Sequence, residues 1–106
     1  PGPSIVIAYS HCIAHGYDMA KGAEHQTNAV KSGYWPLFRY NPHKAKGERF
    51  SLDSKDASLP VEDFLYKEQR FEVIRAKNPA RAEDFLHREE QEISSHWDKL
   101  LTLKNL

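Results

Sequence analysis

The first part of the chain carries one continuous apolar run and, after it, a weakly amphipathic segment. The run at residues 5–9 is rich in β-branched side chains and bounded by turn residues, which predicts a buried strand. A strand that is apolar on both faces is typical of a parallel sheet covered by helices on both sides. After a loop, Asp18 predicts the start of a helix over residues 19–32, which Gly33 ends.

Two further extended segments lie in the middle of the chain. Residues 34–40 are its most aromatic part, and Pro36 restricts them to a sheet edge because proline cannot donate a ladder hydrogen bond. After a polar loop, Phe50 and Leu52 alternate with polar residues, as in a half-buried strand. We expect these segments to pair as an irregular hairpin.

Helical spacing of apolar residues begins at Leu59 and predicts one helix to about residue 77, with Pro60 in its first turn and its apolar stripe interrupted by Glu68. Asn78 predicts a boundary and a cap, because it precedes a proline that suits the first position of a helix. A second long helix follows to about residue 103, and the short connection predicts a helical hairpin. The side chains expected to be buried on the second helix are Ala82, Phe85, Leu86, Ile93, Trp97, Leu100 and Leu101.

The elements predict an α/β fold: a buried strand and helix, an aromatic hairpin or extended segment, and a C-terminal helical hairpin. One strand cannot form a parallel sheet by itself. Either the chain is mainly helical with a small sheet, or the strands that pair with residues 5–9 lie outside it.

Composition limits the function classes. The 106 residues suit one small domain, and 15 basic against 15 acidic residues argue against a general nucleic-acid binder, which carries a basic excess. No apolar run is long enough to cross a membrane, which needs about 18 residues. The single cysteine excludes an internal disulfide and suits a reducing compartment, so we expect a cytoplasmic protein.

Cys12 follows the predicted strand, where open α/β sheets gather their ligands. Together with His11 and His15 it has a spacing found in zinc sites, but a structural zinc needs four ligands, and the spacings to His25 and His43 are not diagnostic. A reactive thiolate needs a base and an orienting group, and no third group stands out. The residues alone leave open an inert packing cysteine, a nucleophile and a zinc ligand.

Several long phrases of the sequence are uncommon. They are SIVIAYSHCIAHG at residues 4–16, SGYWPLFRYNP at 32–42, FSLDSK at 50–55, and the shorter phrases at 68–71 and 78–83. In these phrases the chain resembles the C-terminal end of single-chain pyruvate:ferredoxin (flavodoxin) oxidoreductases over nearly its whole length.

The resemblance implies a segment of an enzyme that decarboxylates pyruvate with thiamine diphosphate and Mg²⁺, forms acetyl-CoA, and passes electrons through [4Fe-4S] clusters to ferredoxin or flavodoxin. It implies that residues 1–58 end the thiamine-diphosphate-binding α/β domain and contain the cluster-ligand loop. Residues 59–106 would be a helical tail packed on the same domain. Cys12 matches the family's fourth cysteine ligand of the cluster nearest the thiamine.

The family's other three cysteine ligands, its Gly-Asp-Gly phrase and its pyruvate-binding residues are not in the chain. We therefore expect a fragment without catalytic residues, inactive by itself, because a [4Fe-4S] cluster needs four ligands. Its partners would be the remainder of a homodimeric enzyme, the electron carrier, pyruvate and coenzyme A, but neither nucleic acid nor a membrane. The alternative is a stand-alone structural or interaction module with an idle cysteine.

Overall fold

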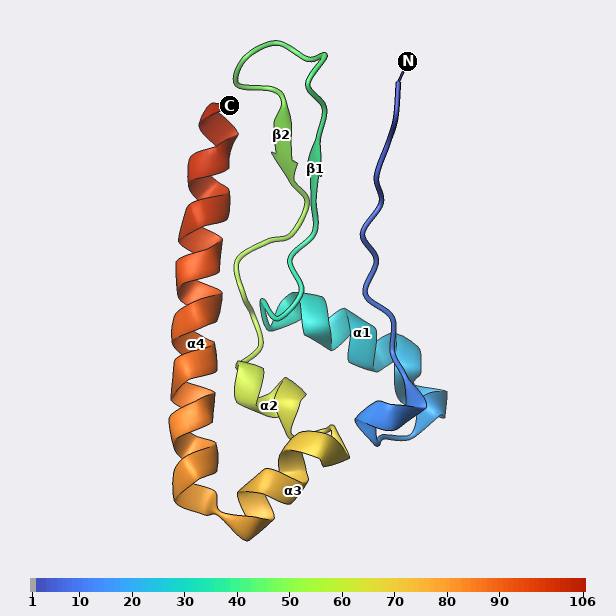
Figure 1. Cartoon of the computed structure of the whole chain (residues 1–106), viewed down its shortest axis with the longest axis vertical. Helices are drawn as coiled ribbons and strands as arrows, with labels where there is room; N and C mark the ends of the chain where they lie inside the picture. Colours follow the sequence, from blue (N-terminus) through green and yellow to red (C-terminus); the bar gives the residue numbers. More distant parts are fainter. Residues whose placement is uncertain (1) are drawn as a thin grey trace.

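A long C-terminal helix forms one side of the computed structural model, which describes residues 2–106 (Figure 1). The hairpin lies beside its upper part, α1 crosses the middle of the molecule, and α2 and α3 lie toward the lower end of α4. The helices are α1 (Gly22–Lys31), α2 (Val61–Leu65), α3 (Gln69–Lys77) and α4 (Pro79–Thr102). The strands are β1 (Phe38–Tyr40) and β2 (Phe50–Leu52), and short 3-10 turns lie at Ile13–His15, Met19–Lys21 and Leu103–Asn105. The structure is broadly α/β, as expected.

The predicted hairpin is confirmed. β1 and β2 pair antiparallel, with Phe38 opposite Leu52 and Tyr40 opposite Phe50. The rings of Phe38 and Phe50 lie 5.5 Å apart, and the adjoining Arg39 and Asp53 side chains form an ion pair at 2.8 Å. Cross-strand aromatic contact stabilises so short a pair of strands.

The predicted Asn78 cap and Gly33 stop are confirmed, but the helix predicted over residues 19–32 begins as an α-helix only at Gly22. The Asp18 carboxylate accepts a hydrogen bond from the Ala20 amide at 3.0 Å, at the start of the turn that leads into α1. Gly33 follows the end of α1 with a φ of 80°, a left-handed conformation that favours glycine. The Asn78 side chain accepts from the Arg81 amide at 3.1 Å and begins α4.

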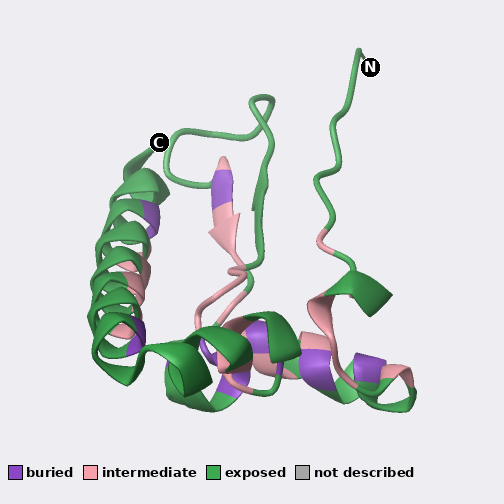
Figure 2. Cartoon of the chain, turned by 60° about the horizontal axis from the view of Figure 1, so that its bottom comes forward, coloured by how far each residue is buried: buried purple, intermediate pink, exposed green. Residues whose placement is uncertain are grey.

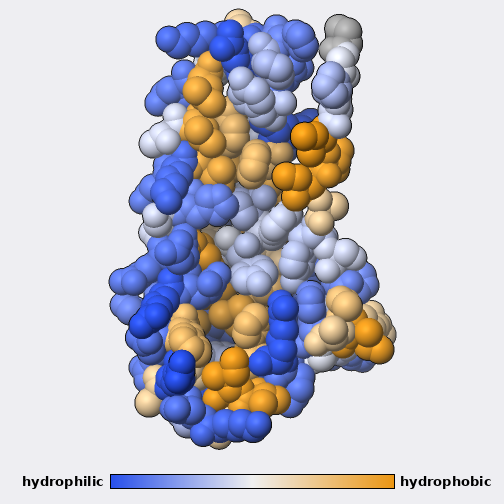
Figure 3. Space-filling model, in the orientation of Figure 1, coloured by the Kyte–Doolittle hydropathy of each residue, from blue (hydrophilic) through white to orange (hydrophobic). Residues whose placement is uncertain are grey.

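The prediction of a strand at residues 5–9 is wrong for this chain. The segment is extended but pairs with no strand, because the only sheet within residues 2–106 is the β1–β2 hairpin. Ile5, Val6 and Ile7 are 87%, 90% and 77% exposed. Their side chains form an apolar patch near the N-terminal end of the molecule, shown in orange in Figure 3. A strand needs a neighbour for its backbone groups, and the described part of the chain supplies none.

The single helix predicted from Leu59 to residue 77 is also wrong. α2 ends at Leu65 and α3 begins at Gln69, with an extended backbone at Glu68 between them. Glu68 is fully buried. The sequence had predicted that it would interrupt the apolar stripe of one continuous helix. Pro60 is the residue before α2 rather than part of its first turn. α3 contacts α4, but it slants away from the lower end of α4 in Figure 1, so the pair forms a corner.

The core lies where α1, α2 and α4 meet, and it appears as purple segments in Figure 2. Its buried members are Ala29, Val61, Phe64 and Leu65, so it joins residues on both sides of position 58. Among the stripe residues predicted on α4, Ala82 and Leu100 are buried and Leu86, Ile93 and Trp97 are half-buried. Phe85 and Leu101 are exposed, which corrects their assignment to the core. No helix within residues 2–106 is both long and apolar enough to span a membrane.

Two glycines with positive φ provide a matched test of how α1 packs on α4. A Cβ at Gly33 would lie 2.8 Å from Cγ2 of Ile93, and the β-branched side chain cannot easily turn away. A Cβ at Gly47, in the hairpin loop, would meet nothing within 4 Å. We expect Gly47→Ala to cost about 1–2 kcal/mol through its backbone alone, and Gly33→Ala to cost about 1–3 kcal/mol more through overpacking.

Urea unfolding of both variants and the parent chain measures this difference. Equal losses for the two substitutions would contradict the close contact between Gly33 and Ile93.

Candidate functional site

The loop that contains Cys12 is a tight turn with an exposed thiol. Cys12 precedes the 3-10 turn Ile13–His15, and its carbonyl accepts a hydrogen bond from the His15 amide at 3.0 Å. Gly16 ends the turn with a φ of 75°. The thiol is free and exposed, so Cys12 is not the buried packing residue that one interpretation proposed.

Glycines hold both flanks of this turn close to the body of the molecule. A Cβ at Gly22 would lie 2.8 Å from Nε2 of His11, so the histidine ring packs directly on the start of α1. On the other flank, the Gly16 carbonyl accepts a hydrogen bond from the Gln69 amide at 2.7 Å. A Cβ at Gly16 would lie 2.5 Å from that of Gln69, which leaves room only for glycine. Cys12 is therefore presented from a loop fastened on both sides.

The buried carboxylate of Glu68 lies next to the Cys12 loop. Glu68 accepts a hydrogen bond from Nε2 of His25 at 2.7 Å through one oxygen and from Nε of Arg70 at 2.6 Å through the other. His25 is 5% exposed, whereas the Arg70 side chain is 37% exposed. Nδ1 of His15 lies 3.9 Å from the carboxylate and has no hydrogen-bond partner in the described structure. Glu68 thus links α1 to α3, and His15 brings the Cys12 loop next to the carboxylate.

Aromatic rings enclose this charged group. The Tyr17 ring lies 4.2 Å from the His25 ring, which stacks on Phe64 at 4.5 Å. The ring of Tyr9 stacks on His15 at 6.1 Å, and its carbonyl accepts a hydrogen bond from Gln26 at 3.1 Å. The apolar run that had been predicted as a strand thus meets the site at its last residue.

The enclosure shifts the ionisation of its neighbours. Burial, and then the negative charge of Glu68, raise the pKa of Tyr9, while burial, Glu68 and the charge of Cys12 raise the pKa of Tyr17. Burial by itself would lower the pKa of Arg70, but its hydrogen bond and charge interaction with Glu68 raise it overall. The tyrosines therefore remain protonated and Arg70 remains a cation at neutral pH.

The histidines and cysteine do not assemble a metal site by themselves. Within residues 2–106, no group of three or more His, Cys, Asp or Glu side chains is placed to hold a metal ion. His25 instead binds Glu68, and His43 lies in the hairpin loop, far from α1 in Figure 1. A zinc site made of Cys12 and these histidines is not formed here.

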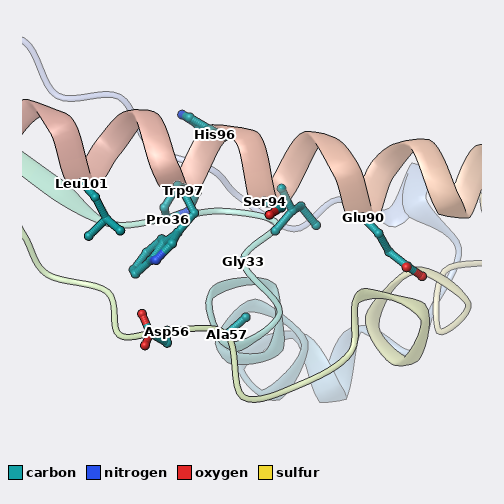
Figure 4. A pocket seen from close by; sticks show the side chains of 10 residues that line it. Gly33, Pro36, Asp56, Ala57, Glu90, Ser94, His96, Trp97 and Leu101 are labelled. Carbon is teal, nitrogen blue, oxygen red and sulfur yellow. The ribbon is translucent and has the colours of Figure 1, made fainter.

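A separate groove lies along α4, with a volume of about 490 Å³ (Figure 4). Trp97 and Leu101 face Pro36, Asp56 and Ala57 across it. Trp97 is consequently half-buried rather than part of a closed core. None of the groove's lining residues belongs to the Cys12 loop.

Sequence patterns alone did not reveal the hydrogen bonds that Glu68 accepts beside the Cys12 loop. His25 entered only as a possible zinc ligand, and Arg70 only through a matching phrase. The available signal was Glu68, an acidic residue within an otherwise apolar stripe. A charge at such a position indicates either solvent exposure or a buried partner, and periodicity cannot decide between them.

Comparison with known proteins found no matching family model. The pyruvate-flavodoxin oxidoreductase of Rhodospirillum rubrum is 45% identical over 96% of this chain and 9% of its own length. The pyruvate:ferredoxin oxidoreductase of Moorella thermoacetica is 36% identical over 92% of the chain and 8% of its own. A probable pyruvate-flavodoxin oxidoreductase of Escherichia coli is 35% identical over 94% of the chain and 9% of its own. The chain thus spans less than a tenth of these curated relatives.

The raised tyrosine pKa values predict a loss of stability in alkali. In the unfolded chain Tyr9 and Tyr17 ionise near their ordinary value of 10.0, whereas in the folded chain they ionise at higher pH. Their contribution to stability is therefore complete below about pH 10 and is lost as the pH rises through the folded values. Urea unfolding between pH 8 and 11 measures the free energy of unfolding, and tyrosinate absorbance recorded in parallel follows the ionisation.

The double variant with Tyr9→Phe and Tyr17→Phe is the control, because it removes the two hydroxyl groups and keeps the rings. We expect its stability to fall less steeply above pH 10. An identical slope would show that these two tyrosines ionise as freely in the folded chain as in the unfolded one.

Proposed function

We propose that this chain, which belongs to the pyruvate-flavodoxin and pyruvate:ferredoxin oxidoreductase family as a homologue of one segment, supplies a cysteine ligand to an iron-sulfur cluster of such an enzyme. The observation that carries the proposal is the state of Cys12. Its thiol is free and exposed, and both flanks of its loop are fastened to the body of the chain. A group outside the chain can reach it without unfolding the loop.

The donor chemistry fits one of the four positions of a [4Fe-4S] cluster. Such clusters are held by four ligands, normally cysteine thiolates, and transfer one electron at a time when bound. Cys12 provides one thiolate, and the other three would come from outside these residues. The chain's own contribution is to hold the thiol at a fixed place, because a fastened loop loses less conformational entropy on ligation than a free one.

The activity that follows is oxidative decarboxylation of pyruvate to acetyl-CoA and CO₂ by the complete enzyme. The names of the relatives support pyruvate as the substrate and flavodoxin or ferredoxin as the electron acceptor. Thiamine diphosphate, Mg²⁺, pyruvate and coenzyme A would bind to other parts of a homodimeric, cytoplasmic enzyme. We assign no catalytic residue to this chain and expect it to be inactive by itself.

The same proposal accounts for the uncovered segment at residues 5–7. Residues 1–58 would end the thiamine-diphosphate-binding α/β domain, and this segment would pair with strands of that domain's sheet. Residues 59–106 would be the helical tail on the same domain. Three adjacent β-branched side chains exposed by 77% or more support this arrangement, because apolar side chains on both faces suit a strand buried within a covered sheet.

The alternative function is a stand-alone structural or interaction module whose cysteine has no ligand role. The same uncovered segment favours it, since an unpaired strand can bind the edge of another protein's sheet. The two functions differ in whether Cys12 is needed for iron.

The cluster assignment predicts the effect of Cys12→Ala in the complete enzyme. Loss of one thiolate should remove or degrade the cluster nearest the thiamine, lowering the content by up to about four iron atoms and four sulfides per chain. Electron exit to the carrier should slow, while pyruvate decarboxylation partly survives. Iron and acid-labile sulfide on anaerobically purified protein measure this.

Ser10→Ala is the matched control, because Ser10 is exposed in the same loop and carries no thiol. It should leave the iron content unchanged. Unchanged iron and an unchanged cluster spectrum in Cys12→Ala would refute the ligand role and leave the interaction module.

The strand assignment predicts that Val6→Asp affects assembly more than local stability. Val6 is 90% exposed, so the charge should change the free energy of unfolding of this chain by no more than about 0.5 kcal/mol. In the complete enzyme the same charge would enter an apolar sheet and prevent correct assembly. Ser4→Asp, at an exposed polar position of the same segment, is the control.

Size-exclusion chromatography of the complete enzyme measures assembly. A Val6→Asp enzyme that assembles like the parent would show that residues 5–7 remain exposed there.

A further inference from the structure

We infer that Glu68 is a positioning residue for the Cys12 loop: its buried carboxylate fixes the point at which the loop is fastened, and so fixes where the thiol is presented. The inference rests on the proposed function only in taking Cys12 as the group to be positioned. It is built from the contacts of Glu68, which none of the comparisons assigns a role.

The Glu68 carboxylate is bound by side chains from two different elements. Glu68 is fully buried, and each of its oxygens is bound, one by His25 of α1 and the other by Arg70 of α3. Burying a carboxylate costs free energy unless both of its oxygens are hydrogen-bonded. Because its two partners come from different helices, the carboxylate is held between α1 and α3. The break between α2 and α3 is thereby fixed against α1.

The residue after Glu68 is bonded directly to the Cys12 loop. Gln69, the next residue, donates its amide to the Gly16 carbonyl at 2.7 Å, and the two residues approach so closely that only glycine fits at position 16. His15 lies between the loop and the carboxylate, with Nδ1 3.9 Å from it. A shift of the backbone at Glu68 must therefore move the Gly16 end of the loop.

Hydrogen bonds within the loop connect Gly16 to Cys12. The His15 amide donates to the Cys12 carbonyl and the Gly16 amide to the Ile13 carbonyl, so residues 12–16 form one hydrogen-bonded turn. On its other side, His11 packs on Gly22. Cys12 thus lies between two contacts, that of His11 with Gly22 and that of Gly16 with Gln69. Weakening the second contact would make residues 12–16 more mobile, while His11 stays packed on Gly22.

The groups facing the carboxylate define the variant to use. They are His25 and Arg70, which bind it, His15, and the tyrosines at positions 9, 17 and 34, whose pKa values its charge raises. Glu68→Gln keeps the side-chain size, removes the charge and replaces one acceptor oxygen by an NH₂ donor that faces either Arg70 or His25. Glu68→Asp keeps the charge on a side chain that is one methylene shorter. We expect its readouts to lie between those of the parent and those of Glu68→Gln.

The test uses the complete enzyme and one control. Glu72→Gln removes an acidic side chain from α3, which begins directly after Glu68, and the Glu72 carboxylate pairs with the half-exposed Arg75 at 2.6 Å. In cluster-free enzyme, the alkylation rate of Cys12 by iodoacetamide is followed by mass spectrometry of its peptide. Hydrogen exchange is followed in the peptide that contains Gln69. In reconstituted enzyme, the electron paramagnetic resonance spectrum of the reduced clusters is recorded.

We expect Glu68→Gln to raise the alkylation rate of Cys12 about threefold or more and to speed exchange of the Gln69 amide. We also expect a shifted resonance of the cluster nearest the thiamine at unchanged iron content. Glu72→Gln should match the parent in all three measurements. A folded Glu68→Gln enzyme with parental alkylation, exchange and resonance would overturn the inference.

Arg70→Gln is the second variant and decides the matter if Glu68→Gln does not fold, because Arg70 is half-exposed and its loss leaves His25 bound to Glu68. It should change the same readouts in the same direction, and parental values would overturn the inference. The two proposals can fail separately. Unchanged iron in Cys12→Ala removes the ligand role, whereas faster alkylation of Cys12 in Glu68→Gln would still show that Glu68 positions the loop.

Discussion

The buried hydrogen bonds of Glu68 are the constraint on which the packing of α1, α3 and the Cys12 loop depends. A fully buried carboxylate must keep both oxygens hydrogen-bonded, and here His25 and Arg70 satisfy them from two different helices. The helical stripe begun at Val61 ends so that Glu68 can turn inward. This turn places the carboxylate between α1 and α3, and the next residue, Gln69, binds the Cys12 loop at Gly16.

Several apolar side chains near the N-terminus are exposed. The segment at residues 5–7 presents three β-branched side chains to solvent, whereas the same chain buries Phe64 and Ala29 completely or nearly so. Exposed apolar side chains in an extended, unpaired segment indicate contact with another polypeptide. Together with an exposed thiol on a fastened loop, this agrees with a chain that is homologous to one segment of a much larger oxidoreductase.

Much of the local structure could be predicted because its causes lie within a few residues. The Asn78 cap, the glycine at position 33 and the β1–β2 hairpin depend on short-range backbone chemistry, and all three are confirmed. The strand at residues 5–9 could not be decided in this way, because pairing depends on a neighbour that the described chain lacks. The candidate site was predictable only in part: Cys12 was identified, but the group behind it was not.

The sequence by itself determined the turns, the caps, the amphipathic last helix and the presence of one cysteine in a glycine-bounded loop. Only the tertiary structure decided that Glu68 faces inward, that His25 is its partner rather than a metal ligand, and that Gln69 fastens Gly16. The reason is separation along the chain. His25 and Glu68 are 43 positions apart in the sequence, so only the tertiary fold brings their side chains within hydrogen-bond distance.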